Sequence, residues 1–143
     1  MGNLEEETYI MNLASMRIIT DDAEKLASFY EVICGAKAQR YTPVFAELRT
    51  PSCTLAFGGT PTLALFNAEG VLAPAQNRTV IIEFRVEDVD QEFERLKTHV
   101  REFVQKPTLM PWGNKSLLFK DPDGNLVNFF TPVTPDATHR ANA

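Results

Sequence analysis

The chain has 143 residues, 44% of them hydrophobic, and a formal net charge of −5, which fits one compact unit with its own core. A mildly acidic chain without a cluster of Lys and Arg is a poor partner for nucleic-acid phosphates, so we expect no nucleic-acid binding. No apolar run reaches the roughly 20 residues of a membrane helix, and the N-terminus is acidic where a secretory signal is basic. The cysteines Cys34 and Cys53 make no disulfide framework, which favours a cytoplasmic protein with reduced thiols.

The first half of the chain predicts one strand, one helix and a series of short strands. Residues 1–10 are expected to be a loose lead-in, and the β-compatible run 11–20 predicts a strand. Asp22 then caps a helix over 23–34, whose apolar residues recur at spacings of three and four and which ends at Gly35. Short β-type runs follow between Pro and Gly residues, at 36–41, 44–50, 53–57 and 62–66.

The second half repeats this order after a linker over 68–78. Residues 79–86 predict a strand, Asp88 caps a second helix, and 105–110 predict a further strand. Two apolar runs then flank the turn residues Asp-Pro-Asp-Gly-Asn at 121–125, a pattern typical of a β-hairpin. The polar tail 134–143 is expected to be flexible.

The repeated order predicts two tandem βαβββ modules with a period of ~65 residues. Module one covers 11–70 and module two covers 79–133, within a single α+β domain over 11–133. The halves also resemble each other locally, because residues 47–55 and 118–126 both carry an apolar run, a Pro turn and a second apolar run.

Several sequence words resemble those of the vicinal oxygen chelate superfamily. They are Trp-Gly at 112–113 followed by the hairpin, Ser-Phe-Tyr at 28–30 in the first helix, and Phe-Arg-Val at 84–86 before the second. That superfamily contains the glyoxalases, bleomycin-binding proteins, fosfomycin resistance enzymes and extradiol dioxygenases. The resemblance covers roughly residues 13–132 and implies that the two modules form a curled mixed sheet shaped like a cup.

The resemblance also implies where a metal would be held, on the first and last strands of each module. The matching positions are Ser15, Ile81 and Asn128, with Ala56, Phe57 or Ala64 as the last-strand position of module one. Ile81 cannot coordinate, whereas divalent cations need carboxylate, imidazole or thiolate ligands. The two histidines, His99 and His139, lie in the second helix and the tail. We therefore expect no metal and no other cofactor.

The alternation of strand side chains predicts which residues face the cup. If Ser15, Ile81 and Asn128 face inward, Arg17 and Glu83 do so too. The predicted ligand-binding residues are Arg17, Glu83, Trp112, Ser116, Asn128 and Phe130. A few polar groups on an apolar concave wall are typical of a small-molecule pocket. Two alternatives stay open: Arg17 and Glu83 form a structural ion pair, and Trp112 belongs to the core or to a dimer interface.

These observations predict a metal-free homodimer that binds a small, partly aromatic molecule, as the resemblance to the antibiotic-sequestering branch implies. No catalytic residue is predicted. One alternative is a metal-dependent glyoxalase-like lyase, isomerase or dioxygenase with an atypical ligand set that includes Glu83. Another is a scaffold whose cup is vestigial. The sequence contains no phosphate loop, no Gly-x-Ser-x-Gly and no Cys-x-x-Cys.

Overall fold

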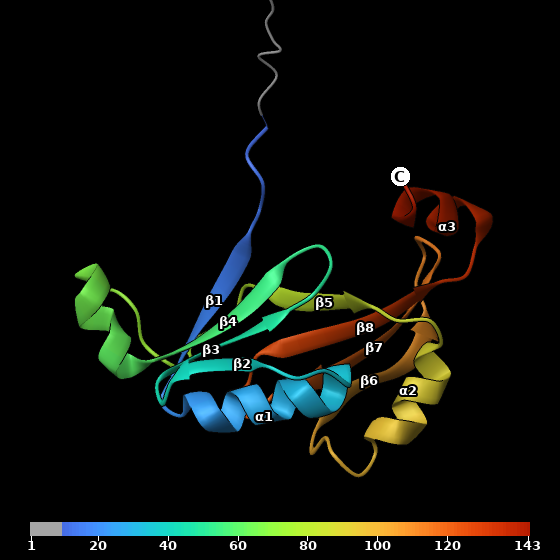
Figure 1. Cartoon of the computed structure of the whole chain (residues 1–143). Helices are drawn as coiled ribbons and strands as arrows, with labels where there is room; N and C mark the ends of the chain where they lie inside the picture. The colour runs from blue at the N-terminus through green and yellow to red at the C-terminus, as the bar shows by residue number, and fades with distance from the viewer. Residues whose placement is uncertain (1–9) are drawn as a thin grey trace, which may run out of the picture.

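The computed structural model describes residues 10–143 and shows two four-stranded sheets (Figure 1). The predicted lead-in, apart from Ile10, lies outside these residues. Module one consists of β1 (Ser15–Thr20), α1 (Ala23–Cys34), β2 (Gln39–Thr42), β3 (Phe45–Arg49), β4 (Thr54–Gly59) and the 3-10 helix η1 (Thr60–Phe66). Module two consists of β5 (Ile81–Arg85), α2 (Val89–Leu96), β6 (Phe103–Leu109), β7 (Asn114–Lys120), β8 (Leu126–Pro132) and α3 (Pro135–Ala141).

Both modules have the same strand order. The sheets run β1-β4-β3-β2 and β5-β8-β7-β6, so that the first strand of each module lies beside its last. These two pairs, β1 with β4 and β5 with β8, are parallel, and the remaining pairs are antiparallel. The predicted α+β class with two tandem βαβββ modules is confirmed. As a consequence of this order, β1 and β5 are edge strands.

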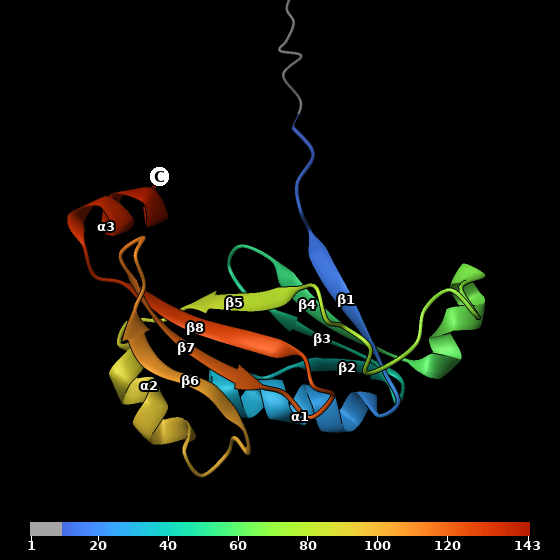
Figure 2. The ribbon, with the colours of Figure 1, turned by 180° about the vertical axis from the view of Figure 1, so that it is seen from behind.

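Helices α1 and α2 cover one face of the two sheets, which we call the helix-covered face. Figures 1 and 2 show both helices below the sheets and α3 above them. Alternate strand residues point toward the helices and, with the buried residues of α1 and α2, form one core across both modules. The core includes Leu48, Phe57, Leu117, Phe119, Val127 and Phe129 from the strands and Tyr30, Ile33 and Leu96 from the helices. The opposite side, which we call the open face, carries the intervening strand residues. No helix within residues 10–143 is long and apolar enough to cross a membrane.

The two modules are connected by a buried polar contact. Tyr30 of α1 donates its hydroxyl to Oδ2 of Asp121, 2.7 Å away in the turn between β7 and β8. The same carboxylate accepts bonds from the side chain of Asn125 and from the backbone N–H groups of Asp123 and Asn125. Burial raises the pKa of Tyr30 well above its ordinary value, so that the phenol remains a neutral donor. With four donors around it, the charge of Asp121 is compensated in the interior.

Both helices begin where the sequence predicted, and α1 also ends there, whereas α2 ends at Leu96, before the Val100 that the apolar spacing had included. Asp22 and Asp88 accept bonds at the N-termini of α1 and α2, and Gly35 ends α1 with a φ of 63°. The hairpin turn is also as predicted, with Gly124 at a φ of 84° between β7 and β8.

Two predicted segments are wrong. Residues 62–66 form part of η1 instead of a strand, because Pro61 lies in the first turn and the Thr62 hydroxyl donates to the Gly59 carbonyl. The tail predicted to be flexible forms α3 over 135–141, capped by the Thr134 side chain. Ala137 packs so closely on the turn between β6 and β7 that a Cβ on Gly113 would lie 2.9 Å from its methyl group.

Replacing Tyr30 with Phe should destabilise the protein by about 1–3 kcal/mol, because Oδ2 of the buried Asp121 then loses one of its donors. Urea denaturation measures this change. Tyr41→Phe is the matched control, since Tyr41 is exposed and its hydroxyl bonds to Glu47 at 3.2 Å. That control should cost less than about 0.5 kcal/mol. Equal losses for the two variants would show that the contact between the modules contributes no special stability.

Candidate functional site

Glu83 and Asn128 lie side by side on the open face of module two. They are register partners on β5 and β8, and the Asn128 amide donates to the Glu83 carboxylate at 2.9 Å. Asn128 is buried, and its carbonyl oxygen accepts no hydrogen bond from the residues that the structure describes. Both residues therefore lie on the open face, as predicted, but the carbonyl oxygen of Asn128 is buried beneath its neighbours.

Ser116 and Phe130 are register partners one step along the same face, on β7 and β8. Ser116 is buried and Phe130 is half-buried. Trp112 lies apart from them, in the turn between β6 and β7, with 57% of its surface exposed. Its carbonyl accepts a bond from Arg140 of α3. The structure thus brings Glu83, Asn128, Ser116 and Phe130 together and leaves Trp112 outside this group.

Arg17 does not pair with Glu83, so the proposed ion pair is wrong. The guanidinium of Arg17 lies over the Phe45 ring at 4.5 Å and over the Phe66 ring at 5.2 Å. Arg17 and Glu83 stand on different edge strands, and each has found a partner within its own module. For Arg17 that partner is an aromatic pair, and for Glu83 it is the amide of Asn128.

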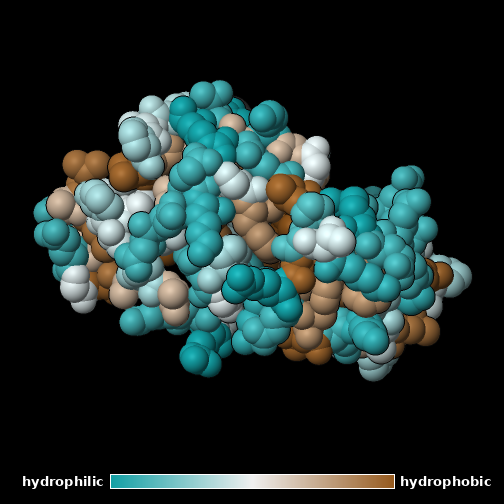
Figure 3. All heavy atoms as spheres, turned by 90° about the horizontal axis from the view of Figure 1, so that it is seen from below, coloured by the Kyte–Doolittle hydropathy of each residue, from teal (hydrophilic) through white to brown (hydrophobic). Residues whose placement is uncertain are grey.

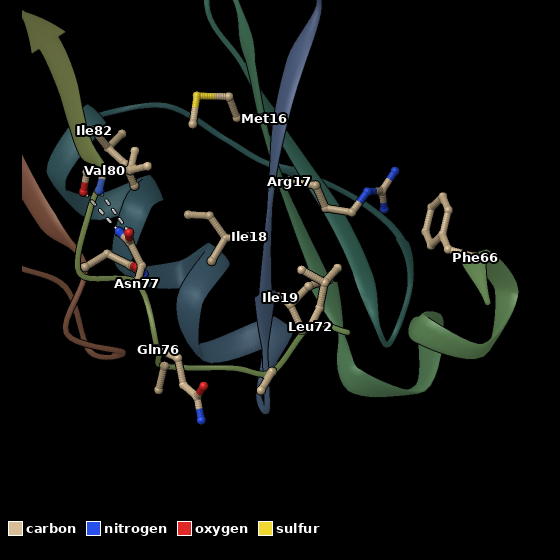
Figure 4. A pocket seen from close by; sticks show the side chains of 13 residues that line it. Met16, Arg17, Ile18, Ile19, Phe66, Leu72, Gln76, Asn77, Val80 and Ile82 are labelled. Carbon is tan, nitrogen blue, oxygen red and sulfur yellow. Dashed lines mark hydrogen bonds between the residues drawn. The ribbon is translucent and has the colours of Figure 1, made fainter. Parts of the chain in front are cut away.

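A pocket of about 450 Å³ lies between the two edge strands, and Arg17 is one of its lining residues (Figure 4). Apolar side chains dominate its wall, with Met16 and Ile18 from β1, Val80 and Ile82 at the start of β5, and Leu72 from the linker. Figure 4 shows the linker passing below the pocket from η1 to β5. Such a volume and such a lining are within the range of small-molecule sites.

The linker wall of the pocket is held by local hydrogen bonds. Oδ1 of Asn77 accepts bonds from the N–H groups of Thr79 and Val80, and its amide donates to the Val80 carbonyl at 3.0 Å. Ala75, which also lines the pocket, has a φ of 58°, a conformation that costs a residue with a side chain about 1 kcal/mol. The wall therefore has a defined shape before any ligand arrives.

The residues at the implied metal positions do not fit a metal. Ile81 and Ala56 have no donor atom, and Asn128 has its amide engaged and its oxygen buried. Within residues 10–143, no group of three or more His, Cys, Asp and Glu side chains could hold an ion.

Thiol chemistry is also disfavoured at Cys34, because burial raises the pKa of its thiol to about 12 and keeps it protonated.

Sequence reasoning missed most of the pocket. The sequence predicts Phe66 in a strand and Leu72 and Asn77 in the linker over 68–78, yet all three residues line the pocket. One signal was present, since Val71 and Leu72 are apolar residues in a segment otherwise typical of a polar linker. The apolar pair Val71 and Leu72, between Gly70 and Pro74, indicates that this linker packs against the rest of the protein.

Comparisons with known proteins agree with this architecture. The family model of the Glyoxalase/Bleomycin resistance protein/Dioxygenase superfamily matches residues 12–129. The uncharacterized protein YetH of Bacillus subtilis (strain 168) is 25% identical over 117 residues, which cover 82% of this chain and 95% of that protein. The resemblance predicted from the sequence words is therefore confirmed.

Two solved structures share the fold. A glyoxalase/bleomycin resistance protein/dioxygenase family enzyme from Burkholderia phytofirmans PsJN has a TM-score of 0.76 and 18% identity, over 86% of this chain and 100% of that one. A glyoxalase/bleomycin resistance protein/dioxygenase from Nocardioides has a TM-score of 0.73 and 20% identity, over 92% and 91%. At such identities the likeness extends to the fold alone.

Protein purified without a histidine tag should contain less than ~0.1 equivalent of zinc, manganese, iron or nickel, because Ile81 and Ala56 have no ligand atom and the carbonyl oxygen of Asn128 is buried. Inductively coupled plasma mass spectrometry after dialysis measures this content. About one equivalent of metal per chain that disappears in Glu83→Ala, the variant that removes the carboxylate bonded to the Asn128 amide, would contradict the expectation.

Proposed function

Because the chain belongs to the glyoxalase/bleomycin resistance protein/dioxygenase superfamily, we propose that it is a metal-independent member that binds a small, partly aromatic molecule. The observation that carries the proposal is the pocket between β1 and β5. It has apolar walls from both modules, a linker wall of defined shape, and only a few polar groups, which is the arrangement that gives orientation to a bound molecule.

Apolar contact supplies the affinity in this proposal. An aromatic group that loses roughly 150–250 Å² of accessible surface in the pocket gains about 4–6 kcal/mol from the hydrophobic effect. The loss of translational and rotational freedom offsets part of that gain. Binding of a bare aromatic compound is then expected in the micromolar to millimolar range, and polar recognition would have to add the rest.

Substituting Val80 with Trp should weaken binding of N-phenyl-1-naphthylamine, a neutral fluorescent probe, by about tenfold or more, because the indole occupies the pocket. Fluorescence titration of the probe measures the dissociation constant. Val80 is 43% exposed, so the larger side chain should be tolerated by the fold.

Val104→Trp is the matched control, since Val104 is 51% exposed on β6 and does not line the pocket. This variant should bind the probe as the wild type does. Binding that Val80→Trp leaves unchanged, or that both variants weaken equally, would place the probe elsewhere on the protein.

We propose further that the protein is a homodimer. Leu65 is 83% exposed and Val71 is 76% exposed, at the end of the molecule formed by η1 and the linker. Figure 3 shows hydrophobic atoms gathered at that end. The edge strands β1 and β5 add unpaired backbone groups, which a partner would cover. The expected partner is a second copy, in line with the symmetry of most oligomers.

Sedimentation velocity at micromolar concentration should give a species of twice the 16.0 kDa chain mass. The double substitution of Leu65 and Val71 by Glu should shift it to the monomer, because charges replace the apolar contact. Val32→Glu, at a position 42% exposed on α1, serves as the control and should leave the dimer intact. A wild-type protein that sediments only as a monomer would exclude the homodimer.

A further inference from the structure

The apolar wall of the pocket between β1 and β5 lies on the helix-covered side of the two sheets. Figure 4 shows Met16 and Ile18 on the same side of β1 as Val80 and Ile82. Ile18 and Ile82 also pack on the core beneath the helices. Arg17 points to the other side of β1, so its charge is turned away from this wall. Polar recognition in the pocket therefore has to come from another residue.

Asn125, the residue before β8, is a polar side chain that lines the pocket from the helix-covered side. It precedes Val127 by two residues, and Val127 belongs to the core, so the alternation of side chains places Asn125 on the same side. Its contact agrees with this placement, because its amide donates to Asp121 at 2.8 Å, beside the hydroxyl of Tyr30 from α1. Only 4% of the surface of Asn125 is exposed.

The contact with Asp121 fixes the orientation of the Asn125 amide. An ionised carboxylate accepts hydrogen bonds and donates none, so the amide nitrogen faces Asp121 and the amide oxygen faces away from it. The bonds of Asn125 to Asp121 use its backbone N–H and its side-chain nitrogen. Its Oδ1 accepts no hydrogen bond from residues 10–143. Asn125 thus holds a fixed acceptor at a largely apolar wall.

The other amide side chains of the pocket offer no comparable group. Asn77 uses both ends of its side chain on the linker backbone. Gln76 is exposed on the linker, where its long side chain can turn toward solvent. A molecule that fills the pocket covers Oδ1 of Asn125 and removes it from water. A buried acceptor that loses water without gaining a donor is costly, so this atom discriminates between ligands.

We infer that the molecule bound in this pocket carries a hydroxyl or N–H group, which donates to Oδ1 of Asn125 while the apolar body lies between β1 and β5. The apolar wall disfavours a full charge on the ligand. The inference rests on the proposed function and adds to it the chemical class of the ligand: a neutral aromatic or other apolar compound with a hydrogen-bond donor, such as a phenol.

Three matched naphthalene compounds test the inference on the wild-type protein: 2-naphthol, 2-methoxynaphthalene and 2-methylnaphthalene. They share one ring system, but the first has a donor, the second has only an acceptor and the third has neither. Equilibrium dialysis, with the free compound quantified by chromatography, measures the three dissociation constants. The naphthol should bind about fivefold tighter than the ether and the hydrocarbon, because one neutral hydrogen bond contributes roughly that factor.

Two variants then assign the preference to Asn125. Asn125→Ala should remove the preference, so that the three compounds bind with similar affinity. Tyr30→Phe is the matched control, because it also takes one donor from the buried Asp121 but leaves the Asn125 side chain in place. This control should keep the preference for 2-naphthol. The comparison of naphthol with ether uses the wild type alone, so it decides the inference even if Asn125→Ala does not fold.

The outcomes separate this inference from the proposed function. If the ether binds as tightly as the naphthol, if the preference survives in Asn125→Ala, or if Tyr30→Phe removes it equally, the donor assignment is wrong while binding in the pocket stands. If none of the three compounds binds the wild type and Val80→Trp has no effect on N-phenyl-1-naphthylamine, the pocket is not a binding site and both proposals fail.

Discussion

The hydrogen bond from Tyr30 to Asp121 joins the helix of module one to the hairpin turn of module two, 91 residues further along the chain. A buried carboxylate is costly unless donors surround it, so the turn of module two is satisfied only when α1 lies against it. This requirement sets how the two sheets approach each other. β1 and β5, which flank the pocket, belong to the two modules that this contact and the shared apolar core join.

A second contact joins the two modules through their helices. Arg95 of α2 donates to the carbonyls of Val32 and Ile33 at the end of α1, where helical carbonyls lack partners. Tyr30 and Leu96 are each the eighth residue of their helix, so equivalent positions of the repeat carry a polar group in one module and an apolar one in the other. The two modules are therefore joined by a tyrosine of one helix and an arginine of the other.

The leading strands of the two modules differ in the same way. Arg17 and Glu83 are each the third residue of the leading strand of their module. Glu83 is engaged by its register partner Asn128, whereas the register partner of Arg17 is Ala56, which has no polar side chain. Gly58, two residues further along β4, leaves room for the Arg17 side chain to cross to Phe45. Arg17 therefore lies on the open face of module one, whereas Met16 and Ile18 of the same strand form the apolar wall of the pocket together with Val80 and Ile82.

The sequence alone determined the two modules, their helix caps, the hairpin and the facing of the strand residues, because these follow from spacing and from local turn chemistry. Ser116, Glu83 and Asn128 were placed on the correct face for that reason. The partner of Arg17 was not predictable, since Phe45 and Phe66 reach it only through the packing of β3, β4 and η1. The strand predicted for 62–66 was wrong because Pro61 and the Thr62 hydroxyl start a 3-10 helix there, a local signal that was not recognised. The flexible tail was wrong because α3 packs on Gly113, a contact that local patterns do not show. The tertiary structure decided the pocket, because its walls come from two edge strands and a linker whose meeting depends on the junction between the modules.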